Sequence, residues 1–395
     1  MKKKLIKEEV LATLDLEFNK EALDWLIGLF DGESGGMYYS ESARDNAQFE
    51  PDIESVCQHQ SILQTLGLVE QAENGDWLFP EWYRVCSSEF IKARQDPDDG
   101  YFYDPVYRKI AGKEKLERNT GFANSFLREM REKPLYATPM ERMKAAKAEK
   151  KSTAENGKNA NAGLEIYESP ESFIAWLDDL KSKTSSYVYG SYIASGDSMI
   201  RASGLSGVLV DWLVKNQNPE NGTWEKNFDM AAVNGVLKLC GQFSENGTPY
   251  PNLEVLLDNL IDFTKTFTPR TAAENWNPLG SLRCIVEAHP NLPPRIREKL
   301  DQSILEMISN TVEKMRMFRQ PDGGFGYLTK GSSVYSNSVV VSLGSPEGDV
   351  NAMALMMLVY NEAYRLTGTP RSHPWKKYRE YFWDEMYKRR APYVK

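Results

Sequence analysis

The chain has 395 residues, of which 41% are hydrophobic and 26% are charged. This is enough apolar material to bury a sizeable core, so the composition excludes wholesale disorder. The formal net charge is −8, and no long basic block offsets it, which argues against a general binder of nucleic acids or anionic membranes. The 4 cysteines are scattered without a Cys-x-x-Cys pair, a pattern typical of buried thiols in a reducing compartment.

The N-terminus begins like a signal peptide, but Lys7, Glu8 and Glu9 interrupt the place where an apolar stretch would have to follow. No run of apolar residues is long enough for a membrane span. We therefore expect a cytoplasmic globular protein with a single domain over residues 1–395.

Helical periodicity dominates the chain. Apolar residues recur at helical spacing over residues 56–68, 206–213 and 230–239, and residues 353–366 are apolar almost all round, as in a buried helix. Strand signals are few: residues 338–343 are the best candidate and residues 185–192 a weaker one. The sequence predicts a mostly α-helical fold.

A short motif recurs between these segments: a Gln, a turn, a Gly and an aromatic residue. Residues 71–77 and 217–224 carry it in full, whereas residues 95–102, 242–247 and 320–325 carry it in part. The Gln amide can bond free carbonyls at a helix end, the Gly can take a positive φ, and the aromatic ring can cover the junction. The simpler interpretation is that these are ordinary helix-to-helix turns.

A helical chain with such turns resembles the α/α toroids of terpenoid cyclases and protein prenyltransferases, over about residues 25–370. The resemblance implies an all-α fold, a barrel of helical hairpins around a central cavity with few short strands. Residues 143–163, rich in Lys, Ala and Asn, do not fit this pattern and are predicted to be a mobile insertion or lid.

Three acidic clusters stand at expected helix starts, where the dipole and free N–H groups stabilise a carboxylate. In two of them the carboxylates lie two residues apart, so one can cap the helix while the other turns inward. We expect Asp52, Glu54 and at least one further member of these clusters to converge on one mouth of the cavity, where mutual repulsion raises the pKa of at least one carboxyl group. The candidate catalytic residues are Asp52, Glu54, Asp229, Glu347 and Asp349.

Residues 52–55 resemble the Asp-x-Asp-Asp acid motif of class II terpenoid cyclases, with Glu54 in place of the middle Asp and Ser55 in place of the last. The resemblance implies that Glu54 donates the proton and that Asp52 tunes it. The helix start at Asp349 resembles the motif equally well. Residues 96–99 match every letter of the motif but lie inside a repeat turn, and we interpret them as turn chemistry.

Two further groups are candidates for substrate binding. Tyr38, Tyr39 and Arg44 form a polar and aromatic loop just before Asp52. Trp276 and Asn277 could line a pocket for a sugar or a hydrocarbon; alternatively, Asn277 caps a helix whose first residue is Pro278.

No metal and no cofactor are expected. Cys57 and His59 are the one close Cys/His pair, which is too few ligands for zinc, and motifs for dinucleotides or phosphate loops are absent from the sequence. Three functions remain open for a small-molecule or oligosaccharide substrate. The chain is a cyclase-like enzyme that protonates an isoprenoid, a carbohydrate-active α/α-barrel enzyme (a glycoside hydrolase or polysaccharide lyase), or a non-catalytic toroid that binds a ligand or peptide.

Overall fold

The fold was analysed in a computed structural model that describes residues 5–107, 110, 112–142, 145 and 165–394. Helices contain 61% of the residues, well above the roughly one-third found in an average globular protein. Within these described residues, strands are confined to two short antiparallel ribbons, β1 (Glu70–Gln71) with β2 (Trp77–Leu78) and β3 (Tyr335–Ser336) with β4 (Val339–Val340). The predicted all-α toroid with few short strands is confirmed.

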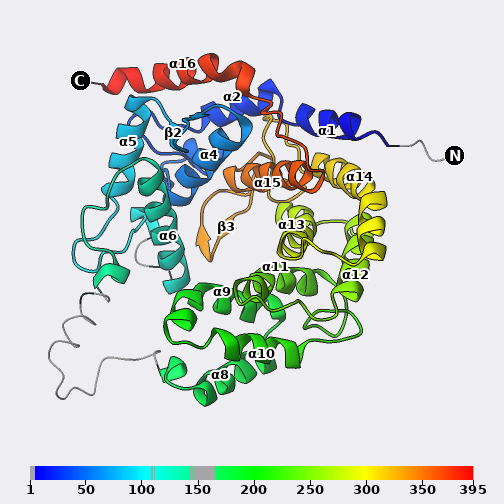
Figure 1. The fold of residues 1–395 in the computed structure, drawn as a ribbon. Coiled ribbons are helices and arrows are strands. Elements are labelled where there is room, and N and C mark those ends of the chain that lie inside the picture. The colour runs from blue at the N-terminus through cyan, green and yellow to red at the C-terminus, as the bar shows by residue number, and fades with distance from the viewer. Residues whose placement is uncertain (1–4, 108–109, 111, 143–144, 146–164, 395) are drawn as a thin grey trace, which may run out of the picture.

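An inner layer of helices surrounds the centre of the molecule (Figure 1). Neighbouring inner helices pack in the order α6–α4–α15–α13–α11–α9, so the ring follows the order of the chain and the last inner helix packs against the first. The last inner helix of the chain, α15, thus lies between α4 and α13. The inner helices are α4 (Ile53–Leu66), α6 (Lys113–Glu129), α9 (Ser186–Ala202), α11 (Met230–Glu245), α13 (Ala272–Ala288) and α15 (Val350–Leu366).

An outer helix precedes each inner one along the chain and covers the ring from outside (Figure 1). Two further helices, α1 (Lys7–Leu16) and α16 (Arg379–Arg390), pack on this layer, and α3 (Glu41–Arg44) is a single turn. One large apolar core extends between the layers. The outer helices are α2 (Lys20–Gly28), α5 (Glu81–Lys92), α8 (Pro170–Lys183), α10 (Ser206–Asn216), α12 (Leu253–Thr266) and α14 (Pro294–Arg316).

The turn at residues 217–224 shows how the recurring motif joins an outer helix to an inner one. The Gln217 side chain donates to the Gly222 carbonyl at 2.9 Å, Gly222 has a φ of 73°, and the buried Trp224 donates to the Leu213 carbonyl at 2.9 Å. Gln71 and Gln95 make the same bond to the glycine carbonyl of their own turns. Gln242 differs, since it lies within α11 and donates to Asp197.

Gly222→Ala should destabilise the protein more than Gly75→Ala does. Both glycines have a positive φ, 73° and 87°, that an alanine adopts at a cost of about 1–2 kcal/mol. A Cβ on Gly222 would also lie 2.7 Å from the Leu256 Cβ and 2.9 Å from its backbone nitrogen, whereas one on Gly75 meets nothing within 4 Å. Urea unfolding of the two variants measures the loss of stability in each. Equal losses would show that the close contacts with Leu256 add nothing to the cost of the positive φ.

The observed elements differ from the sequence-based expectations at one segment and agree with them at another. Residues 185–192 were predicted as a weak strand but form the start of α9, because Tyr189 and Ile193, four residues apart, are both buried on one helical face. Residues 338–343 do contain β4. The insertion predicted at residues 143–163 falls on residues of which the structure describes Ala145 alone. Among the described helices, none combines the length and the apolar character needed to cross a membrane.

Candidate functional site at the mouth of the ring

The first turns of the inner helices α4 and α15 lie side by side at one mouth of the ring. Residues 37–40 bind both: the Met37 carbonyl accepts from the Asp52 N–H at 3.1 Å, and the Tyr39 carbonyl accepts from the Val350 N–H at 3.0 Å. Asp52 caps α4 and Asp349 caps α15. The fold therefore gathers these two carboxyl groups at the same end of the ring.

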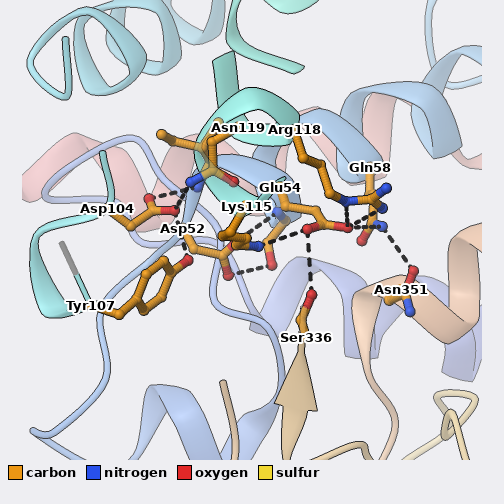
Figure 2. Close-up of polar contacts among 12 residues, drawn as sticks. Asp52, Glu54, Gln58, Asp104, Tyr107, Lys115, Arg118, Asn119, Ser336 and Asn351 are labelled. Carbon is orange, nitrogen blue, oxygen red and sulfur yellow. Dashed lines mark hydrogen bonds and ion pairs between the residues drawn. The ribbon is translucent and has the colours of Figure 1, made fainter. Parts of the chain in front are cut away.

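The connection from α14 to α15 covers this mouth with the β3–β4 hairpin, whose strand β3 points into the centre of the ring (Figure 1). Glu347 fixes the base of the hairpin, because its carboxylate accepts from the Ser42 N–H and hydroxyl at 2.6 and 2.5 Å and from the Ser332 hydroxyl at 2.9 Å. Near the tip, the Ser336 hydroxyl lies 3.4 Å from Glu54 (Figure 2). Glu347 is thus an anchor for the hairpin.

Glu54 is a buried, ionised carboxylate. Its side chain lies between Lys115, 2.8 Å away, and Arg118, 2.5 Å away (Figure 2). Burial opposes ionisation, but the two cations outweigh it and lower the pKa of Glu54 to about 2. The Lys115 side chain is only 1% exposed, so that Glu54 supplies the negative charge that makes its burial possible.

This environment overturns the role that the resemblance implied for Glu54. A proton donor has to keep its proton near neutrality, whereas Glu54 has lost it. The carboxyl groups that keep a proton at this mouth are those of Asp52 and Asp349.

Asp52 and Asp349 hold their protons up to near-neutral pH. Asp52 is 6% exposed and accepts from the Ser55 N–H at 2.8 Å and the Ser55 hydroxyl at 2.7 Å. Burial, followed by the nearby charge of Asp104, raises its pKa to about 7. Asp349 is fully buried and accepts from the Ala352 and Tyr327 N–H groups, each at 2.7 Å; burial raises its pKa to about 7.

The carboxylate next to Asp52 belongs to Asp104, which is not among the candidates from the sequence. It accepts from the Ile53 N–H at 2.9 Å, the Tyr107 hydroxyl at 2.7 Å and the Asn119 amide at 2.8 Å (Figure 2). Arg94 lies 3.5 Å away. The mouth thus combines carboxylates that have cationic partners, Glu54 and Asp104, with carboxyl groups that receive neutral donors.

The other candidate residues lie elsewhere or have different contacts. Asp229 caps α11, further round the ring, with an exposed side chain. Arg44 is directed toward Asp45, Glu41 and the Gly28 carbonyl. Tyr38 and Tyr39 belong to a small apolar cluster under the hairpin, together with Tyr107, Val339 and Val341.

Trp276 and Asn277 lie inside α13, away from its start. The helix is capped by Thr271, so the interpretation of Asn277 as the cap and Pro278 as the first helical residue is wrong. Asn277 donates to Asn234 of α11 at 2.6 Å, and Trp276 is half-buried. A matching amide contact, Gln58 to Asn351 at 2.9 Å, joins α4 to α15.

Cys57 and His59 are buried in α4. The His59 ring contacts the Tyr83 hydroxyl at 3.1 Å, and burial lowers its pKa to about 3, so the ring is neutral. In the part of the chain that the structure describes, no group of three or more His, Cys, Asp or Glu side chains is placed to hold a metal ion.

The spacing of residues in α6 contains a signal for the buried Lys115, the cation that pairs with Glu54. Residues 113–119 read as a charged, solvated helix, but Lys115 and Asn119 are four residues apart and continue the face that buries Ala123 and Phe126. A charged residue on the apolar face of a helix signals a buried partner. Asp104 gave no such signal, because its loop brings it to α4 through tertiary contacts.

Comparison with known proteins gave one similar fold. No protein-family model and no curated protein matches the chain. Among solved structures, it is similar to the type II terpene cyclase MstE from Scytonema, determined with its product merosterolic acid A, at 14% identity and a TM-score of 0.42 over 91% of this chain and 98% of that one. A similarity of this size assigns no activity, and the function has to be argued from the side chains at the mouth of the ring.

Proposed function

We propose that the protein is an enzyme whose reaction begins with proton donation from Asp52 to a small-molecule substrate. One observation carries the proposal: Asp52 is a buried carboxyl group with neutral hydrogen-bond donors beside a second carboxylate, and its pKa is raised to about 7. A group that is still protonated near neutral pH is matched to general-acid catalysis there.

Asp349 has a similar pKa but is less suited to this role. Its side chain is fully buried, and its two oxygens accept separate backbone N–H groups. Asp52 instead borders a small cavity lined mostly by apolar side chains, among them Phe49, Tyr107 and Val340. In this conformation the cavity has room for about one water molecule, so it has to widen for a substrate to reach Asp52.

The apolar and aromatic surroundings of Asp52 favour protonation of an isoprenoid alkene or epoxide, followed by ring closure. Aromatic faces stabilise the carbocations of such a reaction, and an apolar lining limits the water that could trap them. This is the chemistry implied by the resemblance to class II terpenoid cyclases.

A carbohydrate substrate is the second candidate, favoured by a different observation. Neighbouring inner helices are joined by amide pairs, Gln58 with Asn351 and Asn234 with Asn277. Amide side chains are suited to hydroxyl groups, as both donors and acceptors. On this reading Asp52 protonates a glycosidic oxygen and a second carboxylate activates water or attacks the sugar.

Isotope labelling separates the two reactions. The protein is incubated with acyclic polyprenyl alcohols and their epoxides, and separately with oligosaccharides, in D₂O and in H₂¹⁸O, and the products are analysed by mass spectrometry after back-exchange of hydroxyl deuterium. Cyclisation of an alkene gives an isomer of the substrate that carries one carbon-bound deuterium, because a solvent deuteron is added to carbon and a carbon-bound proton is lost. Cyclisation of an epoxide gives an isomer whose solvent deuteron is on the new hydroxyl group and is removed by back-exchange, so that product is an unlabelled isomer without ¹⁸O. Glycoside hydrolysis gives two fragments that together gain one water, with ¹⁸O in one of them.

The acid assignment is tested in the same assay. Turnover of either kind should disappear in Asp52→Asn and persist in Asp229→Asn, which alters an exposed helix cap of the same type. Full turnover in Asp52→Asn, or no turnover of either substrate class by the unaltered protein, would contradict the proposal, and the second result would favour a non-catalytic binding toroid.

A further inference from the structure

Two carboxyl groups share the first turn of α4. The Ser55 N–H donates to Asp52 at 2.8 Å, and the Ile53 N–H donates to Asp104 at 2.9 Å. Both side chains are almost completely buried, at 6% and 3% exposure. Two carboxylates held this closely in a buried site are costly to ionise together, so the pair retains one proton over a wide pH range.

The donors around the two carboxyl groups are unequal. Asp52 receives two hydrogen bonds, both from Ser55. Asp104 receives three, from the Ile53 N–H, the Tyr107 hydroxyl and the Asn119 amide, and the Arg94 guanidinium lies 3.5 Å away. Donors and a cation favour the ionised form of the carboxyl group they contact. Burial raises the pKa of both carboxyl groups, and the shared proton is therefore favoured on Asp52, the member with fewer donors.

We propose that Asp104 is a positioning residue: held ionised by its donors and Arg94, it keeps the proton of the pair on Asp52. The inference rests on the proposed function, in which Asp52 is the acid. Asp104 lines the same cavity as Asp52, and the role inferred for it is to act through its negative charge on Asp52. Proton donation from Asp52 would leave both carboxylates charged, so Asp104 also favours rapid recovery of the proton afterwards.

The other titratable groups around Asp52 do not supply the negative charge that Asp104 supplies. Lys115 from α6 lowers the pKa of Asp52, and is itself paired with Glu54. Tyr107, Tyr39 and the Cys57 thiol are neutral, because burial raises their pKa values. Arg94 from α5 lies on the far carboxylate, Asp104. Glu54 is an anion, but Lys115 and Arg118 offset its charge.

Carbon-13 NMR of Asp carboxyl groups tests the inference without a substrate. The Cγ signals of Asp52, Asp104 and Asp349 are assigned from the signals lost in the three single Asp→Asn variants and followed from pH 4 to pH 9. In the unaltered protein, the step near pH 7 should belong to Asp52 and Asp349, while Asp104 titrates at lower pH. In Asp104→Asn, the Asp52 step should move down by at least about one pH unit, because the neighbouring anion is gone.

Asp349 is the internal control, since its step near pH 7 should stay in place in Asp104→Asn. An Asp104 signal that carries the near-neutral step would overturn the inference, as would an Asp52 step that does not move in Asp104→Asn. If Asp104→Asn does not fold, the unaltered spectrum still decides which residue holds the proton. Because the titration requires no turnover, an inactive protein with the expected titration would refute the proposed function and leave the proton assignment standing.

Discussion

Asp52→Asn should lower kcat/KM at least about 100-fold, the range of a lost general acid, while the fold stays intact. Asparagine has the shape of the protonated aspartic acid, and it is an equally good helix cap, since its side-chain oxygen can accept from the Ser55 N–H as Asp52 does. Steady-state kinetics with the substrate found by isotope labelling measure the loss. In the unaltered protein, kcat/KM should fall about tenfold per pH unit above pH 7, where Asp52 loses its proton.

Stability measurements distinguish a lost proton from a lost fold. The folded-state pKa of Asp52, about 7, is above its ordinary value of 3.8, so its contribution to stability is present at low pH and is lost as the pH rises through 7. The free energy of unfolding of Asp52→Asn relative to the unaltered protein should therefore rise between pH 5 and pH 8. Loss of activity accompanied by unfolding at pH 5 would count against a catalytic role.

Glu54→Gln should cost about 3–5 kcal/mol of stability, the range for removal of one partner from a buried ion pair. The amide cannot balance the charge of Lys115, which is 1% exposed and would be left in the core without its carboxylate. If Glu54 were the proton donor, as the resemblance to the acid motif implies, this substitution would stop turnover and spare the fold. The ion pairs reverse that expectation. Urea unfolding measures the effect.

Two further variants test the ion-pair explanation. Arg118→Gln should have a much smaller effect, because the Arg118 side chain is 42% exposed and Lys115 keeps its pair with Glu54. Addition of Lys115→Met to Glu54→Gln should recover most of the lost stability, since both charges are then absent. A Glu54→Gln protein as stable as the original would show that Lys115 is balanced by another group.

The sequence predicted the inner helices better than the chemistry of the site. Apolar spacing and acidic caps identified the helices that begin after Asp52, Asp229 and Asp349, because these signals are local. Residues 185–192 were misread because Tyr and Val, which favour strands, outweighed the burial spacing of Tyr189 and Ile193. A propensity scale does not include the neighbouring helix, against which these side chains pack.

The site was predictable only in part, because protonation states depend on tertiary neighbours. The acid motif drew attention to Asp52 and Glu54 together, and the sequence gave no means to tell which of them keeps its proton. That difference comes from Lys115, 61 residues away in the chain, and from Asp104, 51 residues from its contact at Ile53. Glu347 is a second example. Its position before a helix suggested catalysis, whereas its hydrogen bonds from Ser42 and Ser332 make it an anchor for the β3–β4 hairpin.

The contact between α4 and α15 also bears on how the chain folds during its synthesis. The Gln58–Asn351 bond joins residues 293 positions apart, and Glu347 reaches Ser42 across 305. At the 5–20 residues per second of a ribosome, α4 waits roughly 15–60 s for the helix that covers its flank. During that time an apolar surface stays open to other nascent chains and to chaperones, so a truncation before residue 350 would leave the ring incomplete and prone to aggregation.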